Sequence, residues 1–308
     1  MKLVRGQHNL HHALRGGSVT IGVFDGVHRG HQAMIRQLQR GPGPHTVMSF
    51  DPMPLEVLAP ARAPARLSSV RERLEDLRGE GVDQCFLLRF DRALAAMTPE
   101  AFVQTLLVDG LGARRVLVGD DFRYGRDRAG DVDALTAAGA SAGFVVERLD
   151  TVSDAQARIS STRVREALAD GDVVQAEALL GRPYRMTGRV RRGQGKGAGL
   201  GFATANLHIR RKPAPCFGVY ATRLRFGDGR CLPGVSNLGV RPTMAGSEGC
   251  WLETHLLDWS GDLYGAQVSV EFLRFLRPER RFDGLDALTA QIADDVAAAR
   301  ATHAALAR

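Results

Sequence analysis

The sequence is poor in cysteine and lacks any long apolar run. Its four cysteines, Cys85, Cys216, Cys231 and Cys250, are widely spaced in 308 residues and form no C-x-x-C pair. This spacing argues against a zinc ribbon and against a disulfide framework, so we expect buried or inert thiols. No apolar run approaches the roughly 20 residues that span a bilayer, and the N-terminus lacks the apolar core of a signal peptide. We therefore expect a cytoplasmic protein that does not bind a membrane.

Aromatic residues are also few, at 6% of the chain, although the formal net charge is +7. A basic protein attracts anions, and arginines crowd the stretch from Arg182 to Arg192. Aromatic side chains do not interleave with these charges as they do on a base-stacking platform. A surface strand with solvated arginines is the first interpretation, the phosphates of a small ligand the second, and nucleic acid the third.

The first half of the chain has no P-loop, G-x-x-x-x-G-K-[ST], and its main motif is not the dinucleotide-binding G-x-G-x-x-G. What it has instead is VTIGVFDGVHRGH at 19–31. The apolar, β-branched run 19–24 predicts a buried strand, Asp25-Gly26 a turn, and 32–40 a helix.

Two histidines, His28 and His31, therefore fall where a strand leads into a helix N-terminus. Free N–H groups and the positive end of the helix dipole make such a junction favourable for phosphate. For one histidine alone, an ordinary polar position at a helix start is the simpler interpretation. For the whole strand–turn–helix unit, we favour a phosphate site.

Strand-like and helix-like segments alternate up to about residue 180, which predicts a doubly wound parallel sheet covered by helices on both faces. Ligands of such sheets bind at the carboxyl ends of the strands, where the first strand places His28 and His31. The expected strands are 19–24, 45–50, 82–88, 115–118 and 144–149, and the expected helices are 32–40, 70–78, 99–109, 132–138, 163–169 and 173–180.

Beyond Gly181 the pattern changes to short strands separated by Gly and Asp turns, which predicts a small antiparallel β-barrel. An alanine-rich helix over 285–306 follows it. We therefore expect one domain over 1–182 and a second over 183–308. The expected strands of the second domain are 184–190, 218–226, 235–238, 251–258 and 268–275.

The longer motif GVFDGVHRGH resembles the H-x-G-H signature of the nucleotidyltransferase superfamily, and more closely that of the bacterial bifunctional riboflavin kinase/FMN adenylyltransferases, or FAD synthetases. Three further stretches resemble the adenylyltransferase half of this family: FDPMPLEVL at 50–58, GDDFRYG at 119–125 and ISSTRVR at 159–165. One position departs, because Met53 stands where the family usually has His. Since Met cannot donate a strong hydrogen bond, a slower adenylylation is expected if that position assists nucleotide binding.

The resemblance implies a Rossmann-like nucleotidyltransferase domain with His28 and His31 as catalytic residues. Adenylyl transfer joins the FMN phosphate to the α-phosphate of ATP and expels pyrophosphate, which calls mainly for positioning and charge neutralisation. Arginines suit bidentate contact with phosphate. The residues implied for ATP are Gly22, Phe24, Asp25, His28, His31, Ser161, Thr162, Arg163 and Arg165, and those implied for the flavin are Asp120, Phe122 and Tyr124.

The second half resembles riboflavin kinase. GQGKGAGLGFATAN at 193–206 resembles the family's G-R-x-L-G-F-P-T-A-N, although Ala198 replaces the usual Arg and Ala203 the usual Pro. NLGVRPT at 237–243 and LETHLLDW at 252–259 resemble two further motifs of that half.

The resemblance implies ATP-binding by Gly201, Thr204 and Asn206, the last two also holding Mg²⁺ through neutral oxygens. It places Arg241 and Thr243 at the flavin. Glu253 is the implied catalytic base, which accepts the proton of the ribityl hydroxyl as it attacks the γ-phosphate. Alternation along a strand puts Glu253, His255 and Leu257 on one face; taken alone, Glu253 fits a solvent-facing strand position.

We interpret the chain as a bifunctional enzyme that makes FMN from riboflavin and ATP, and then FAD and pyrophosphate from FMN and a second ATP. The expected partners are these small molecules, with no nucleic acid and no membrane, and the oligomeric state stays open. Two alternatives remain. One is a member of the same family with one activity impaired, through Met53 or through Ala198 and Ala203. The other is a basic RNA-binding protein.

Overall fold

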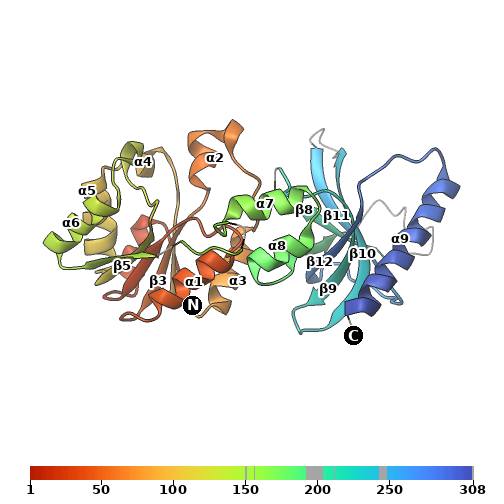
Figure 1. Ribbon diagram of the computed structural model, residues 1–308, viewed down its shortest axis with the longest axis horizontal. Helices are drawn as coiled ribbons and strands as arrows, with labels where there is room; N and C mark the ends of the chain where they lie inside the picture. The colour runs from red at the N-terminus through yellow and green to blue at the C-terminus, as the bar shows by residue number, and fades with distance from the viewer. Residues whose placement is uncertain (150, 156, 192–203, 212, 243–247, 307–308) are drawn as a thin grey trace. The chain divides into compact units, whose positions relative to one another are not determined.

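The chain forms two compact units in a computed structural model (Figure 1). The first unit comprises residues 1–64 with 68–160, and the second comprises 65–67 with 161–308. The structure describes residues 1–149, 151–155, 157–191, 204–211, 213–242 and 248–306.

The first unit is built on a six-stranded sheet of order β1-β4-β3-β2-β5-β6, in which every pair of strands is parallel. This confirms the doubly wound sheet that the sequence predicts. Its strands are β1 (Lys2–Arg5), β2 (Ser18–Ile21), β3 (His45–Phe50), β4 (Gln84–Leu88), β5 (Arg115–Gly119) and β6 (Val145–Leu149). Its helices are η1 (Gln7–His12), α1 (Arg29–Leu38), α2 (Pro54–Leu58), η2 (Pro60–Arg62), α3 (Val70–Gly79), α4 (Arg92–Ala95), α5 (Pro99–Phe102) with its π-helical continuation η3 (Val103–Gly110), η4 (Arg126–Arg128) and α6 (Val132–Ala142).

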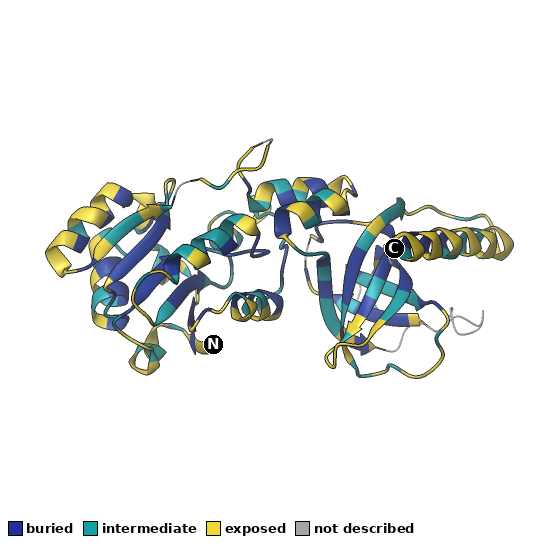
Figure 2. Cartoon of the chain, turned by 60° about the horizontal axis from the view of Figure 1, so that its bottom comes forward, coloured by how far each residue is buried: buried dark blue, intermediate teal, exposed yellow. Residues whose placement is uncertain are grey.

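Helices cover both faces of this sheet, because successive strand residues point to opposite faces and both sets are apolar. On one face, Ile35 of α1 and Leu77 of α3 pack against alternate residues of β3 and β4. On the other face, Leu106 of η3 and Leu135 of α6 pack against the remaining strand positions. The central strands β2, β3, β4 and β5 are accordingly buried along most of their length, whereas the edge strands β1 and β6 are more exposed (Figure 2).

The second unit contains a closed, six-stranded antiparallel barrel of order β10-β11-β8-β7-β12-β9, followed by the helix α9 (Leu285–Leu306). Its other helices are α7 (Ser161–Ala169) and α8 (Val173–Leu180), and its strands are β7 (Tyr184–Arg191), β8 (Thr204–Ile209), β9 (Gly218–Phe226), β10 (Cys231–Pro242), β11 (Glu248–Leu256) and β12 (Gln267–Arg277). The predicted barrel and closing helix are confirmed.

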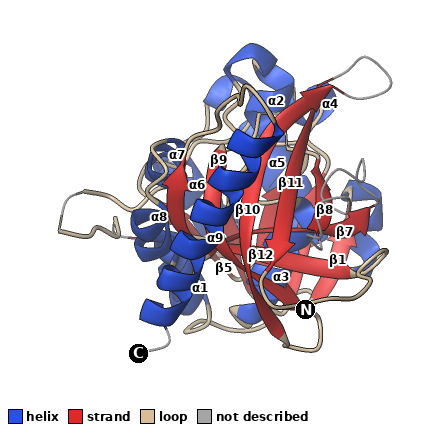
Figure 3. Cartoon of the chain, turned by 90° about the vertical axis from the view of Figure 1, so that its right-hand side faces the viewer, coloured by secondary structure: helices blue, strands red, loops and turns tan. Residues whose placement is uncertain are grey.

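The C-terminal helix α9 lies along β9, β10 and β12 (Figure 3). Its fully buried Ala299 belongs to an apolar cluster with Val219, Val235 and Leu257, so a small side chain allows the helix to approach the barrel closely. Among the described residues, no helix combines the length and the apolarity needed to cross a membrane.

Helices α7 and α8 group with the barrel, so the two compact units divide between residues 160 and 161. Gly171 between these helices has a φ of +76° and lies against the ring of Phe275 in β12, where a Cβ atom would come within 2.9 Å. The expected domain boundary between 182 and 183 stays a prediction.

Candidate active sites

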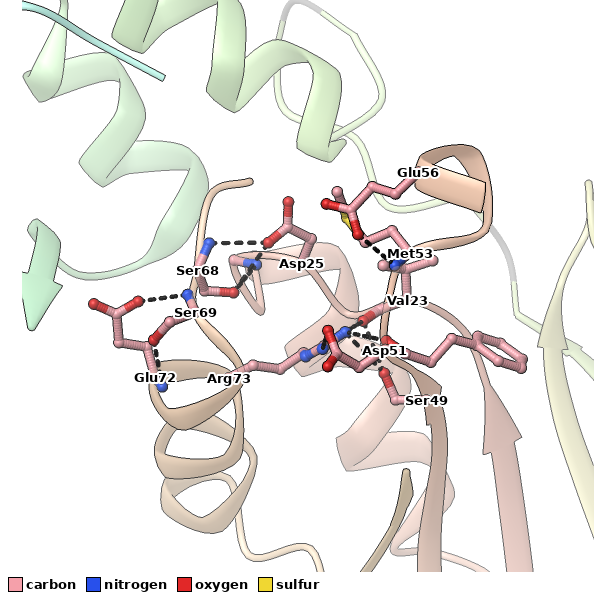
Figure 4. Close-up of polar contacts among 12 residues, drawn as sticks. Val23, Asp25, Ser49, Asp51, Met53, Glu56, Ser68, Ser69, Glu72 and Arg73 are labelled. Carbon is pink, nitrogen blue, oxygen red and sulfur yellow. Dashed lines mark hydrogen bonds and ion pairs between the residues drawn. The ribbon is translucent and has the colours of Figure 1, made fainter. Parts of the chain in front are cut away.

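The turn between β2 and α1 has an unusual backbone. Phe24 and Val27 have positive φ angles of 55° and 41°, which residues other than glycine rarely adopt. The Asp25 carboxylate accepts hydrogen bonds from the backbone N–H and the hydroxyl of Ser68, at 2.9 and 3.0 Å. The Gly26 N–H donates to the same hydroxyl at 3.1 Å (Figure 4). Asp25, one of the residues expected at ATP, is therefore buried and bound to Ser68, which lies just before α3.

The two histidines lie together at the start of α1, as the sequence predicts. His28 is the N-cap residue, and its Nδ1 accepts a hydrogen bond from the His31 N–H at 3.4 Å. The two rings are stacked, with centroids 3.7 Å apart, and the Phe24 ring lies 4.8 Å from that of His31. Burial, followed by the positive charges of His28, Arg158 and Arg73, holds the pKa of His31 well below its usual value.

His31 is therefore neutral near neutral pH. In that form one ring nitrogen donates a hydrogen bond and the other accepts one. Its Nδ1 has no hydrogen-bond partner within the part of the chain that the structure describes. A neutral imidazole at a helix N-terminus can donate to a phosphate oxygen without first losing a partner.

Two glycines bring other groups close to this site. A Cβ atom on Gly22 would lie 3.1 Å from the Phe24 ring. A Cβ atom on Gly30 would lie 3.1 Å from the His28 ring and 3.3 Å from the carbonyl oxygen of Ile159. The start of the ISSTRVR motif therefore passes directly over the first turn of α1.

Arg158, immediately before that motif, was not among the residues that the sequence singled out. Its guanidinium contacts both carboxylate oxygens of Asp121, at 3.0 and 3.2 Å, and lies 3.7 Å from Asp120. The hydroxyl of Thr151 donates to Asp120 at 2.9 Å, which is the main cause of the lowered pKa of that carboxyl group. The positive charge of Arg158 is also one cause of the lowered pKa of His31.

The aromatic residues of the GDDFRYG loop differ in burial. Tyr124 belongs to the core, packs on Phe102 with ring centroids 5.4 Å apart, and has a pKa raised by burial. Phe122 stacks on Tyr124, with centroids 5.5 Å apart and an interplanar angle of 14°, and is only partly buried. Tyr124 thus supports Phe122, and flavin contact by Asp120, Phe122 and Tyr124 stays a prediction.

Met53, which stands where the family usually has His, is the N-cap residue of α2. Its side chain is buried, and its backbone N–H donates to the Glu56 carboxylate at 2.8 Å (Figure 4). The position is therefore held by the backbone, while the side chain offers a thioether instead of a hydrogen-bond donor.

The four predicted phosphate ligands of the ISSTRVR motif lie on α7, in the second unit. Ser161 and Thr162 lie in the first turn of this helix. Arg165 is tied down, because its Nε donates to the carbonyl oxygen of Ala65 at 2.6 Å. ATP contact by Ser161, Thr162, Arg163 and Arg165 stays a prediction.

In the barrel, Glu253 of β11 lies in a row of polar residues that crosses three strands. It is directly opposite Asn237 of β10 and Asn206 of β8. Residues opposite each other in antiparallel strands present their side chains on the same face. Thr204, two residues before Asn206, is paired with His255 and shares that face. The register thus groups the predicted base with both predicted Mg²⁺ ligands.

The strand alternation holds for Glu253 and His255 but not for Leu257. β11 ends at Leu256, so Leu257 follows the strand and packs in the apolar cluster with Ala299. Asn237 is itself anchored, since its Nδ2 donates to Glu279 at 2.9 Å. A side chain on Gly239 would lie 2.1 Å from that carboxylate, so glycine makes room for it.

Several predicted residues lie outside the described residues: Ala198, Gly201, Ala203 and Thr243. For Arg241 the structure gives only the backbone, which pairs with Gly249. Among the described residues, no three His, Cys, Asp or Glu side chains are grouped closely enough to hold a metal ion. The hydroxyl and amide oxygens of Thr204 and Asn206 suit a hard cation whose other ligands are phosphate oxygens and water.

The first unit carries a histidine pair at the carboxyl end of a parallel sheet, as expected for a nucleotidyltransferase. The barrel groups a carboxylate with neutral oxygen groups, as expected for a kinase. Together they define the class of a two-part enzyme. The family model for FAD synthetase matches residues 10–163, and that for riboflavin kinase matches residues 180–303. The chain belongs to the bifunctional riboflavin kinase/FMN adenylyltransferase family.

Relatives of this kind match the chain along its length. It is 48% identical to the bifunctional riboflavin kinase/FMN adenylyltransferase of Pseudomonas fluorescens, covering 99% of this chain and 98% of that one. It is 47% identical to that of Escherichia coli K12, covering 97% of each. A crystal structure from Streptococcus pneumoniae, described as a macrolide-efflux protein, is 28% identical, with a TM-score of 0.83 over 97% of this chain and 99% of that one.

Proposed function

We propose that the histidine site of the first unit transfers the adenylyl group of ATP to FMN, and that the Glu253 site of the barrel phosphorylates riboflavin. Family membership gives the chain both activities, riboflavin kinase and FMN adenylyltransferase. The observation that carries the division between sites is the stacked pair His28 and His31 at the N-terminus of α1, in which His31 is neutral. This arrangement suits phosphate chemistry without a protein nucleophile.

At the histidine site, the phosphate oxygen of FMN attacks the α-phosphorus of ATP, and the bond to pyrophosphate breaks. Negative charge grows on the leaving pyrophosphate during this step. The backbone N–H groups in the first turn of α1 and the imidazole N–H of His31 can donate hydrogen bonds to the pyrophosphate oxygens. Because these donors are already held in place, they do not have to reorganise during the reaction. Arg158, which is bound to Asp121 of the GDDFRYG loop, adds a positive charge that also lowers the pKa of His31.

At the barrel site, Glu253 accepts the proton of the ribityl hydroxyl as that oxygen attacks the γ-phosphorus of ATP. Thr204 and Asn206 would hold Mg²⁺ and the nucleotide phosphates, and Arg241 and Thr243 would contact the flavin. Mg²⁺ held there would supply positive charge to offset that of the transferred phosphoryl group. The support for this assignment is the register, which sets Glu253 beside Asn206 and places Thr204 on the same face.

We further propose that residues 1–182 carry the adenylyltransferase and 183–308 the kinase, in the cytoplasm, without nucleic-acid partners. The positions of the two family matches support this division. Purified full-length protein, given riboflavin, ATP and Mg²⁺, should form FMN first and FAD later, as separated by chromatography. Accumulation of FMN alone would show an impaired adenylyltransferase. Salt-sensitive RNA retention without flavin turnover would favour the RNA-binding alternative and contradict the proposal.

A further inference from the structure

A buried guanidinium from α3 joins the carboxyl ends of β2 and β3. Nη1 of Arg73 donates to the carbonyl oxygen of Val23 at 2.6 Å, to that of Phe50 at 3.1 Å and to the hydroxyl of Ser49 at 3.1 Å (Figure 4). The Arg73 side chain is only 4% exposed, and the Asp51 carboxylate lies 4.0 Å from it. A buried charge needs such partners, so this geometry is strongly specified.

The contacts of Arg73 converge on the turn that carries the histidines. Val23 immediately precedes Phe24, whose φ of +55° needs support from its surroundings. On the other side of Phe24, Ser68 holds Asp25 through its N–H and its hydroxyl. Ser68 lies just before α3, so one helix and its leading residue hold the chain on both sides of Phe24.

Phe24 in turn packs against the histidine site, because the centroid of its ring lies 4.8 Å from that of the His31 ring. The hydroxyl of Ser49 adds a second tie, since it donates to Val23 at 2.9 Å while it accepts from Arg73. A displacement of Val23 would therefore pass through Phe24 to the imidazole.

We propose that Arg73 is a positioning residue for adenylyl transfer: it fixes Val23, and through Phe24 it fixes the orientation of His31 toward the nucleotide phosphates. This inference rests on the proposed role of His31. Independently of that contact, the positive charge of Arg73 is one of the influences that keep His31 neutral. Arg73 does not need to touch ATP or FMN to act in this way.

The same helix offers a matched control. Arg71, two residues earlier, is exposed at 62% of its side chain and lies 3.9 Å from Glu75 one turn along α3. Arg71→Met removes a guanidinium from α3 without touching the strand ends. It should leave both activities unchanged.

The test uses full-length Arg73→Met, Arg73→Lys and Arg71→Met, with kcat and the KM for ATP measured for FMN adenylylation, and riboflavin phosphorylation as an internal control. Arg73→Met should lower the adenylylation kcat about ten- to a hundredfold, the scale of a small misplacement of a catalytic group. The KM for ATP should change much less. Arg73→Lys should lose only about threefold, because an ammonium carries three donors for the same three acceptors but lacks the planar fork. Riboflavin phosphorylation should persist in all three variants.

The same variants in a His31→Ala background separate positioning from general support of the fold. If Arg73 acts through His31, adding Arg73→Met to His31→Ala should cost less than about threefold more, because residues that act as a unit are not additive. Full additivity overturns the inference, as does a folded Arg73→Met with kcat within about twofold of the parent. If thermal melting shows that Arg73→Met does not fold, Arg73→Lys decides. Arg73→Lys must then lower the adenylylation kcat of the parent but not that of His31→Ala. The inference is overturned if Arg73→Lys lowers kcat in both backgrounds, or in neither. A normal FAD yield from His31→Ala alone would instead contradict the proposed function.

Discussion

The imidazole of His31 lies stacked on that of His28, with ring centroids 3.7 Å apart, at the first turn of a helix that starts at the carboxyl end of a parallel sheet. Two stacked imidazoles cannot both carry a proton cheaply, because like charges at this distance repel. The pair therefore enters the reaction with His31 neutral. In that state the His31 imidazole can donate a hydrogen bond although it carries no charge.

This protonation state has a consequence for stability. The folded pKa of His31 lies below that of an unfolded chain, about 6.5. Neutral His31 therefore contributes its full stability above that value, and the contribution is lost as the pH falls from it toward the folded pKa. We expect the melting temperature of the parent to fall below pH 6.5 more steeply than that of His31→Gln, which does not titrate. Parallel pH profiles of melting temperature for the two proteins would contradict the assignment.

Met53 gives a second prediction. The side chain is buried at the start of α2 and cannot donate a strong hydrogen bond. Replacing it with the residue that the family usually has, Met53→His, should raise the rate of FAD formation about two- to tenfold, the value of one added hydrogen bond. FMN formation in the barrel should not change. A steady-state assay with FMN and ATP measures the effect, and an unchanged or lower rate shows that this position does not limit adenylylation.

Gly30 gives a third prediction. A methyl group there would press on the His28 ring at 3.1 Å and on the Ile159 carbonyl oxygen at 3.3 Å, so it displaces either the imidazole or the ISSTRVR segment. Gly30→Ala should lower adenylylation about tenfold or more, since small displacements of catalytic groups are costly. The matched control is Gly79→Ala, because a Cβ atom at Gly79 in α3 meets nothing within 4 Å. Equal adenylylation rates for the two variants would show that adenylylation does not need the close approach of the His28 ring and the Ile159 carbonyl oxygen to Gly30.

The sequence predicted both folds because their patterns are local. Alternating apolar strands and helices define the parallel sheet, and short strands between turns define the barrel. The end of the first strand was placed wrongly, at residue 24 instead of Ile21, because the apolar run continues into a turn where Phe24 has a positive φ. β1 and β8 were not predicted. β8 follows the glycine-rich stretch and carries the polar residues Thr204 and Asn206, which obscure its alternation.

The candidate sites were predictable to the extent that a motif carried them. His28 and His31 are three residues apart and are brought together by one helical turn, so the sequence suffices to pair them. Arg73 and Arg158 were missed because their importance comes from contacts across the fold. Arg73 binds carbonyl oxygens 23 and 50 residues away, and Arg158 binds a carboxylate 37 residues away. Periodicity and local motifs contain no signal for such pairings.

The most direct test of two separate sites is one pair of single variants assayed side by side in full-length protein. His31→Ala should convert riboflavin to FMN at the parent rate but form FAD about ten- to a thousandfold more slowly, the scale of one electrostatic contact in a transition state. Glu253→Gln should form FMN about a hundred- to ten-thousandfold more slowly, as expected for loss of a positioned base, yet convert supplied FMN to FAD normally. Chromatography of riboflavin, FMN and FAD over time reports both steps. Loss of both activities in either folded variant, or near-normal turnover of the assigned step, would contradict the account.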